Sequence, residues 1–418
     1  MAEIKRKLNI KRPAQARKPI VAFCGTRGLP AQYGGFETAI DHITRDFYQA
    51  GFDCEVFCRA LDDNETPERN EGRRLRYISG SRRRLLDTFM ASIQTGRVLW
   101  RERHRYDCAM WFNNANLPGI LITRLARIPT VVNTDGLEWK RAKWSWPFKL
   151  YYYLSSWLVS RLKVTLVSDS VGIQDYYRKT FGAESQFVPY GAPREYDVSP
   201  KRQADILGKY GLEAGKYFLQ ITRIEPDNLP LETAAAFAAT DLSRQGFQAV
   251  IVGYQHPTPY AKRLLAFDGS NGVRVLEANY DADELYALRR NCRCYVHGNS
   301  VGGTNPALLE AMAVCPRVIA IDIDFSREVL GQNGCFFQEQ SLAEVLVSAA
   351  HDMPDRSKAM QRRIAERYRW DAVARSYMNL AQGRPAAYLK DATGDRVVER
   401  DAVRQALEQS TSTDREAD

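Results

Sequence analysis

The 418-residue sequence predicts an α/β protein with two Rossmann-like, doubly wound domains that face each other across a cleft. Three observations indicate this fold. The chain is too long for one ordinary hydrophobic core, short apolar runs alternate with stretches of helical periodicity, and the alternation is interrupted once, at VPYGAPREYDVSP (residues 188–200), before it resumes. We expect the N-terminal domain to span residues 18–192 and the C-terminal domain to span residues 193–368.

The predicted strands are short apolar runs, most of them separated by a helical stretch. In the first domain they cover residues 19–26, 53–59, 107–112, 129–134 and 163–168. In the second domain they cover residues 216–222, 248–253, 273–277, 292–298 and 317–322. Helical periodicity is clearest over residues 38–51, 229–240, 281–291 and 305–314.

The two ends of the chain differ from the predicted domains. Residues 1–17 are basic and lack the apolar stretch of a secretory signal, so we expect a solvated arm and a cytoplasmic protein. Residues 369–386 are expected to form a helix that packs back on the N-terminal domain, and residues 387–418 a polar tail. The eight cysteines mostly lie in apolar runs without zinc-site spacing, which is typical of reduced core residues.

The net charge of +9 predicts attraction to an anionic partner: nucleic acid, a membrane surface or a phosphorylated substrate. No apolar run reaches the roughly 18 residues of a transmembrane helix, so any membrane contact is expected to be peripheral. No recognised nucleic-acid-binding module accompanies the charge, and we expect no nucleic-acid partner.

A glycine-rich loop follows the first predicted strand, in GTRGLPAQYGGFETAI (residues 25–40). Gly25, Gly28, Gly34 and Gly35 would let backbone amides approach an oxyanion at the N-terminus of the next helix. The spacing does not match G-x-G-x-x-G, which argues against an NAD-dependent oxidoreductase. The loop can be interpreted either as a structural turn or as a ligand-binding loop.

A second glycine-rich loop lies in HGNSVGGTNPALLEAM (residues 297–312). A strand ends at His297, and a helix begins near Pro306, so free backbone amides again suit a phosphate. Glu310, further along this helix, could accept hydrogen bonds from a ribose diol. The alternative is a capped core helix with Glu310 in solvent.

Four segments of the sequence match motifs of a known family: GTRGLPAQYGGFET, DGLEWKRAKW, RIEPDN and HGNSVGGTNP. They resemble the motifs of glycosyltransferase family 4, retaining enzymes of GT-B fold, and in particular a bacterial subgroup that includes rhamnosyltransferases of surface-polysaccharide assembly. Glu310 matches the second glutamate of the family's donor motif, whereas Gly302 stands at the first. Arg223 matches the diphosphate-binding arginine, and Asn228 stands at the usual lysine. Asp135 stands where many relatives place a histidine.

The resemblance implies that the second domain holds a nucleotide-diphospho-sugar and the first presents the acceptor. The donor would be bound by Arg223, Asn228, Gly302, Gly303, Thr304, Asn305 and Glu310. Arg223 and Asp135 would serve catalysis, and the loop with Gly25, Gly28, Gly34, Gly35 and Glu37 would lie on the acceptor and diphosphate side. No metal or cofactor is implied. dTDP-rhamnose is the first donor expected, ahead of UDP- and GDP-sugars, and the acceptor is a saccharide or a polyprenyl-diphosphate-linked one.

Aromatic and basic residues gather between residues 139 and 157. Trp144, Trp146, Lys140, Arg141 and Lys143 predict a peripheral contact with anionic lipid at the cytoplasmic membrane face. A second basic cluster, formed by Arg73, Arg74, Arg76 and residues 82–84, could assist. The alternative is a set of core aromatics beside a solvated basic face.

Two other functions are weighed against transfer. A sugar-nucleotide epimerase of the same GT-B fold would release a changed nucleotide sugar without any acceptor. A non-catalytic binder of nucleic acid or another anionic ligand would show strong salt dependence and no affinity for nucleotide sugars.

Overall fold

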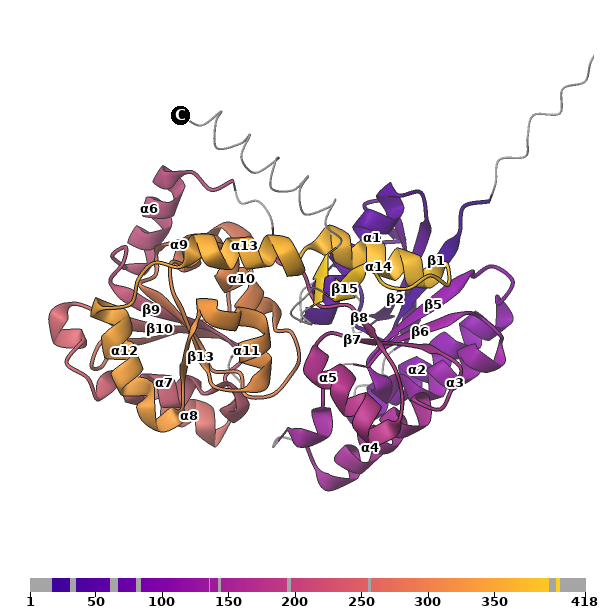
Figure 1. The fold of residues 1–418 in the computed structure, drawn as a ribbon, viewed down its shortest axis with the longest axis horizontal. Helices are drawn as coiled ribbons and strands as arrows, with labels where there is room; N and C mark the ends of the chain where they lie inside the picture. Colours follow the sequence, from indigo (N-terminus) through magenta and orange to yellow (C-terminus); the bar gives the residue numbers. More distant parts are fainter. Residues whose placement is uncertain are drawn as a thin grey trace, which may run out of the picture.

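The computed structural model describes residues 17–30, 35–60, 67–79, 84–134, 136–141, 144–193, 197–254, 257–390 and 396–398. Two α/β domains lie side by side, and the C-terminal helices run from the second domain back to the first (Figure 1). The predicted architecture of two Rossmann-like domains is confirmed.

The N-terminal domain is built on a sheet with the strand order β3-β4-β2-β1-β5-β6-β7-β8. Its strands are β1 (Ile20–Cys24), β2 (Asp53–Ala60), β3 (Arg69–Asn70), β4 (Arg73–Ser79), β5 (Cys108–Phe112), β6 (Thr130–Asn133), β7 (Thr165–Ser168) and β8 (Gln186–Phe187). Its helices are α1 (Gly35–Gln49), α2 (Arg84–Arg101), α3 (Leu117–Leu125), α4 (Trp146–Val159) and α5 (Val171–Tyr176). Only β3 runs antiparallel to its neighbour.

The C-terminal domain has the strand order β11-β10-β9-β12-β13-β14, all parallel. Its strands are β9 (Tyr217–Ile221), β10 (Gln248–Gly253), β11 (Val273–Glu277), β12 (Cys294–His297), β13 (Val318–Ile321) and β14 (Cys335–Phe337). Its helices are α6 (Pro200–Tyr210), α7 (Pro230–Ala238), α8 (Pro259–Leu265), α9 (Ala282–Asn291), α10 (Pro306–Val314), α11 (Asp324–Leu330), α12 (Leu342–His351) and α13 (Ser357–Arg367). The strand order reverses between β9 and β12, and a ligand binds at such a switch point in this class of fold.

Helices cover both faces of each sheet because their apolar residues recur at helical spacing. On α1, for example, Ala39, Ile40, Ile43 and Phe47 are all buried against the first sheet. Seven of the eight cysteines are buried and all are free thiols. Among the described helices, none combines the length and hydropathy that crossing a bilayer requires.

The helix α14 (Trp370–Ala381) ties the end of the second domain to the first. Its first residue, Trp370, stacks on His42 of α1 with ring centroids 4.5 Å apart. The two crossings between the domains run next to each other, since the backbone amide of Ala192 donates to the Tyr368 carbonyl over 2.8 Å.

The expected polar tail from residue 387 onward is wrong for its first part. A short antiparallel pair, β15 (Tyr388–Lys390) and β16 (Arg396–Val398), follows α14. Tyr388 and Val398 are buried, and the Tyr388 ring packs edge-on against Phe187 at 5.4 Å. Three-residue strands are too short for an alternating pattern to stand out from their polar neighbours.

Candidate active site

The loop between β12 and α10, residues 298–305, lies at the switch point of the second sheet. Residues 226–228 pack against this loop. The Ser300 amide and hydroxyl both donate hydrogen bonds to the Asp227 carbonyl, over 2.8 and 2.9 Å. A side chain at Gly298 would meet the Asn228 carbonyl, because an ideal Cβ there lies 2.3 Å from that oxygen. We call residues 298–305 the switch-point loop.

The switch-point loop ends in a capped helix. The Asn305 side chain accepts a hydrogen bond of 2.9 Å from the Ala307 amide, and Pro306 stands in the first turn of α10. Proline removes a donor that the first turn cannot satisfy, and the partial positive charge of the helix start favours an anion nearby. The structure thus places a helix N-terminus where the sequence predicted one.

Arg223 follows β9, the strand adjacent to β12 in the sheet. Its side chain is exposed and forms no ion pair with any residue that the structure describes. A guanidinium without a carboxylate partner, next to the switch point, suits a diphosphate because its fork of donors matches phosphate oxygens.

Asn228, predicted to bind the donor, is instead a brace inside the domain. It is 1% exposed, its side-chain amide donates to the Arg223 carbonyl over 2.9 Å, and its own carbonyl accepts from Gln220 over 2.7 Å. A buried amide needs such partners, so Asn228 holds the backbone of the Arg223 loop.

Glu310 lies in the second turn of α10 and pairs with Arg289 of α9. The Arg289 side chain is 4% exposed, whereas that of Glu310 remains 26% exposed. The buried guanidinium therefore orients the carboxylate and leaves part of it open to solvent.

Asp169 supplies the opposite wall from the first domain. It follows β7, and its side chain lies against bare backbone of the switch-point loop: an ideal Cβ on Gly303 would be 2.1 Å from Asp169 Oδ1. The Thr304 hydroxyl donates to the Asp169 carbonyl, and both residues are buried. The sequence interpretation missed Asp169, although its position directly after the predicted strand 163–168 was a usable signal.

The segment after β6 also faces the switch-point loop. An ideal Cβ on Gly136 would lie 3.5 Å from the Gly302 Cα, and Arg141 Nη2 donates to the Val301 carbonyl over 3.3 Å. Arg141 also pairs with Glu138 at 2.6 Å, and its side chain is 12% exposed. The prediction that Arg141 faces a membrane surface is therefore wrong, because its side chain points to the switch-point loop. Asp135 lies outside the described residues.

The first glycine-rich loop owes its glycines to packing. Gly25 and Gly28 have φ of +95° and +99°, and an ideal Cβ on them would lie 2.5 Å from the Phe112 carbonyl and 2.3 Å from Cys58 Sγ. Glu37 is buried and accepts from the Arg27 amide over 3.0 Å, so its carboxylate braces this loop and does not face an acceptor.

Gly35 is the point at which the first glycine-rich loop approaches the second domain. An ideal Cβ on it would lie 3.1 Å from Pro306 Cγ. Gly34 lies outside the described residues. The start of α1 therefore packs against the start of α10.

The residues predicted for a membrane interface divide into two groups. Trp146 is 72% exposed and Lys140 is exposed, whereas Trp144 stacks on Phe148 at 4.0 Å and donates to Glu138 over 2.8 Å. Lys143 lies outside the described residues. Arg73 of the second basic cluster is 1% exposed and pairs with Asp41, so burial removes it from the surface.

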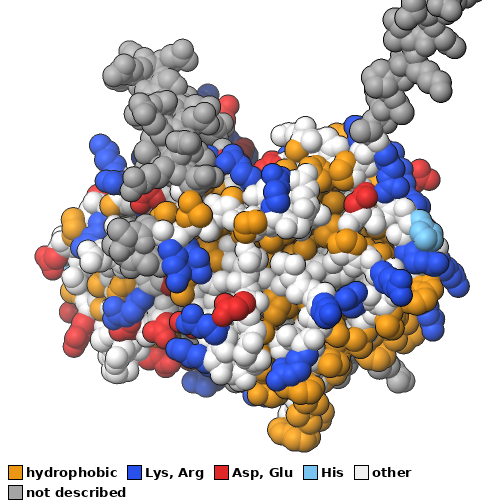
Figure 2. Space-filling view, turned by 45° about the vertical axis from the view of Figure 1, so that its right-hand side comes forward, with side chains coloured by type: hydrophobic (Ala, Val, Ile, Leu, Met, Phe, Trp, Pro, Cys, Tyr) orange, Lys and Arg blue, Asp and Glu red, His pale blue; other side chains and the backbone are white. Residues whose placement is uncertain are grey.

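Hydrophobic side chains gather over the α2–α4 side of the N-terminal domain, with basic side chains among them (Figure 2). We call these side chains the α2–α4 apolar surface. The exposed large hydrophobic residues of α2 and α4 are Phe89, Met90, Trp100, Trp146, Leu150, Leu154 and Trp157.

Burial shifts the pKa of titratable groups in both domains. Burial lowers the pKa of His297, at the end of β12, to about 3, so the imidazole is neutral. Burial raises the pKa of the Cys54 and Cys108 thiols to about 12, which makes them poor nucleophiles. Among the described residues, no three His, Cys, Asp or Glu side chains converge as metal ligands.

Comparisons with known proteins agree with this geometry. Residues 204–369 match the family described as Glycosyl transferases group 1, and residues 124–193 match a domain of unknown function (DUF1972). No curated protein matches the sequence.

Solved structures share the whole two-domain fold. Sucrose-phosphate synthase from Thermosynechococcus elongatus superposes with a TM-score of 0.72 at 16% identity, covering 88% of this chain and 99% of that one. HepE from Anabaena, in complex with UDP and glucose, superposes with a TM-score of 0.68 at 16% identity, covering 88% of this chain and 100% of that one. Trehalose 6-phosphate synthase from Burkholderia multivorans superposes with a TM-score of 0.62 at 12% identity, covering 88% of this chain and 98% of that one. The chain thus has a GT-B fold, and residues 204–369 are similar to the Glycosyl transferases group 1 family.

Proposed function

We propose that this protein is a glycosyltransferase that moves a sugar from a nucleotide-diphospho-sugar to an acceptor hydroxyl. One observation carries the proposal: within the Glycosyl transferases group 1 domain, Arg223 and the start of α10 lie at the carboxyl ends of adjacent central strands. Asp169 of the other domain closes against the same loop. This arrangement offers positive charge to a diphosphate and a second wall for an acceptor.

The proposed chemistry is transfer with retention of configuration. The bond between the anomeric carbon and the phosphate oxygen breaks, the acceptor oxygen bonds to the same carbon, and the acceptor proton goes to the leaving phosphate. Arg223 and the amides around Gly303 and Thr304 stabilise the negative charge on the diphosphate. No metal or cofactor is part of this scheme, and Asp135 or Asp169 contacts the sugar or acceptor.

The proposed donor is dTDP-rhamnose, from the resemblance to the rhamnosyltransferase subgroup. UDP-sugars come next, since HepE, which shares the fold, was solved with UDP-glucose. GDP-sugars follow. The proposed acceptor is a saccharide or polyprenyl-diphosphate-linked saccharide of surface-polysaccharide assembly, such as an exopolysaccharide or O-antigen.

A peripheral position on the cytoplasmic membrane face fits a lipid-linked acceptor. The α2–α4 apolar surface includes Trp146, which is 72% exposed, and Leu154, which is 49% exposed. Lys149 lies in the same helix, α4, and Arg161 follows it. Exposed aromatic and aliphatic side chains beside basic ones are typical of proteins that bind anionic lipid.

The test is a panel of nucleotide sugars offered to the full chain, first for thermal stabilisation and then for turnover. We expect one donor to stabilise the fold, and its nucleotide diphosphate to be released faster when an acceptor is added. A changed nucleotide sugar that forms without any acceptor would identify an epimerase instead. Duplex binding without stabilisation by any nucleotide sugar would contradict both enzymatic functions.

A further inference from the structure

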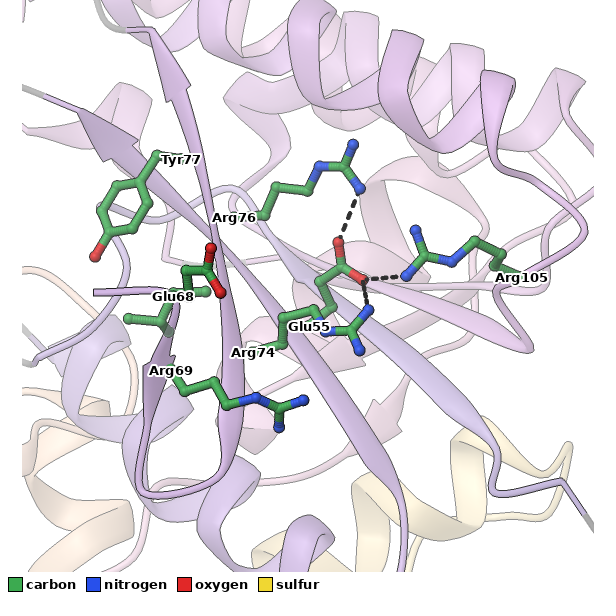
Figure 3. A pocket seen from close by; sticks show the side chains of 8 residues that line it. Glu55, Glu68, Arg69, Arg74, Arg76, Tyr77 and Arg105 are labelled. Carbon is green, nitrogen blue, oxygen red and sulfur yellow. Dashed lines mark hydrogen bonds and ion pairs between the residues drawn. The ribbon is translucent and has the colours of Figure 1, made fainter. Parts of the chain in front are cut away.

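A cavity of about 410 Å³ opens at the outer edge of the N-terminal sheet (Figure 3). Glu55, the third residue of β2, and Arg74, the second residue of β4, line it. These are the amino ends of parallel strands, whereas the switch-point loop lies at carboxyl ends. The cavity therefore lies apart from the proposed active site, and its volume is in the range of small-molecule sites.

The strand register places three charged side chains in one row across the cavity. Arg69 of β3 lies directly opposite Arg74 of β4, and Arg74 is in register with Glu55 of β2. Like charges directly opposite each other on a ladder destabilise it unless a counter-charge is present. An anion bound between the two guanidinium groups would reduce their electrostatic repulsion.

Two carboxylates line the cavity: Glu68 is exposed, whereas Glu55 is already engaged by other arginines. Glu55, whose side chain is 2% exposed, accepts from Arg76 and Arg105 over 3.1 Å each (Figure 3). Both arginines also pair with Glu102, and the Arg76 guanidinium in particular lowers the pKa of that carboxyl. Glu55 and Glu102 thus have little capacity left for a further cation.

Arg69 and Arg74 are left with an excess of positive charge. Arg74 reaches Glu55 only at 4.0 Å and is 49% exposed. Arg69 donates to the Gly72 carbonyl over 2.8 Å and forms no ion pair within the described part of the chain. The lining holds four arginines and two glutamates, Glu55 and Glu68, so a bound anion would reduce its excess of positive charge.

We propose that this cavity binds a small phosphate-bearing molecule, with phosphate oxygens held between Arg69 and Arg74. The planar guanidinium fork matches phosphate geometry, and these charge-assisted hydrogen bonds are stronger than neutral ones. The phosphate belongs to a free solute or to a lipid headgroup, which offer the same chemistry to the two arginines.

The experiment titrates inorganic pyrophosphate into the full chain by calorimetry, in an Arg223→Ala background that removes the proposed donor contact. We expect Arg69→Gln with Arg74→Gln to weaken the remaining binding about tenfold or more, because two charged hydrogen-bonding groups are lost. Arg244→Gln with Arg362→Gln is the matched control: it removes the same charge from exposed ion pairs and should leave binding unchanged.

Vesicles with and without phosphatidylglycerol distinguish the two sources. Loss of vesicle binding in the Arg69/Arg74 variant, with pyrophosphate competing in the parent protein, assigns the site to a headgroup; loss of pyrophosphate binding alone assigns it to a solute. Pyrophosphate and vesicle binding that are both unchanged in this variant overturn the proposal. Neither outcome depends on sugar transfer, so the proposed function can fail or stand separately.

Discussion

Asp169 and Gly303 show at the scale of single residues how the two domains fit together. The carboxylate lies where a side chain on Gly303 would begin, since the ideal Cβ is 2.1 Å from Oδ1. Thr304 adds a hydrogen bond to the Asp169 carbonyl, so the contact joins residues 135 positions apart. A glycine is required here by close approach alone, which a local turn pattern does not reveal.

We predict that Gly303→Ala impairs closure of the domains, because the new methyl group collides with Asp169. Overpacking of this kind costs about 1–3 kcal/mol, measurable as a lower free energy of unfolding and a lower rate of donor turnover. Asp169→Ala removes the colliding atoms, so the double variant should resemble Asp169→Ala alone. Additive losses in the double variant would contradict the direct contact.

Arg223 is the residue on which the donor proposal depends most. Its exposed guanidinium has no described carboxylate partner, so Arg223→Ala should leave the unfolding midpoint unchanged. Turnover on the identified donor should fall about 100- to 1,000-fold, the usual effect of losing one donor to a developing oxyanion. Arg244→Ala, at an exposed ion pair, is the control, and near-normal turnover in Arg223→Ala would refute the role.

His297 makes stability depend on pH below neutrality. Burial lowers its pKa from 6.5 to about 3, so the folded chain keeps the imidazole neutral while the unfolded chain takes up a proton below about pH 6.5. The unfolded state then binds more protons, and stability falls as the pH drops from 6.5 toward 3, by up to about 1.4 kcal/mol per pH unit.

His297→Asn should flatten this acid limb of the stability curve, measured as unfolding midpoints between pH 4 and 7. The control is His104→Asn at an exposed position, which should leave the slope as it is. An unchanged slope in His297→Asn would show that other groups dominate the acid dependence.

At the scale of elements, α11 of the second domain caps α5 of the first. Glu328 accepts from the Val171 and Gly172 amides over 2.7 and 3.3 Å. The carboxylate supplies both an acceptor and negative charge to the start of a helix, where free amides and the helix dipole favour it. Phe325 packs beside it, 3.1 Å from an ideal Cβ on Gly172.

We predict that Glu328→Ala lowers the free energy of unfolding by about 1–2 kcal/mol, the usual cost of a lost helix cap. Glu328→Gln keeps an oxygen acceptor and should lose less. Urea unfolding followed by tryptophan fluorescence measures both. Glu366→Ala, which breaks an exposed pair within α13, should change little, and an equal loss in that variant would argue against a specific cap.

At the scale of the whole molecule, the contact at Asp169 and the α2–α4 apolar surface belong to the same domain. Asp169 follows β7 and contacts the switch-point loop of the second domain, whereas helices α2 and α4 carry exposed apolar side chains (Figures 1 and 2). Binding of that surface to a membrane would hold the cleft near a lipid-linked acceptor.

We predict that Trp146→Ser with Leu154→Ser weakens binding to phosphatidylglycerol vesicles about tenfold or more, because burial of each large apolar side chain contributes about 1.5–3 kcal/mol. Turnover on a soluble acceptor should change less. Tyr280→Ser, at a residue of the second domain that is 69% exposed, is the control. Vesicle binding that is equal in all three proteins would remove the membrane proposal.

The sequence by itself determined the fold class and most of the elements. Strands of parallel sheets read as continuous apolar runs, and helices show their period, so both are encoded locally. The short strands β3, β8, β14, β15 and β16 were not predicted because two or three residues carry no period. The seven-residue strand β4 was also missed, because three arginines interrupt its apolar residues. The helix start at Pro306 and the exposed Arg223 were also readable, since caps, glycine loops and family motifs are local.

Only the tertiary structure decided which side chains face one another. Asp169 lies against Gly303, Asn228 turns inward to brace a loop, and Arg69 stands opposite Arg74. The first contact depends on the packing of one domain against the other, the second on burial of Asn228 against the Arg223 loop, and the third on strand register. The sequence therefore predicted the loops of the candidate site, and the tertiary structure decides which of their residues are in contact.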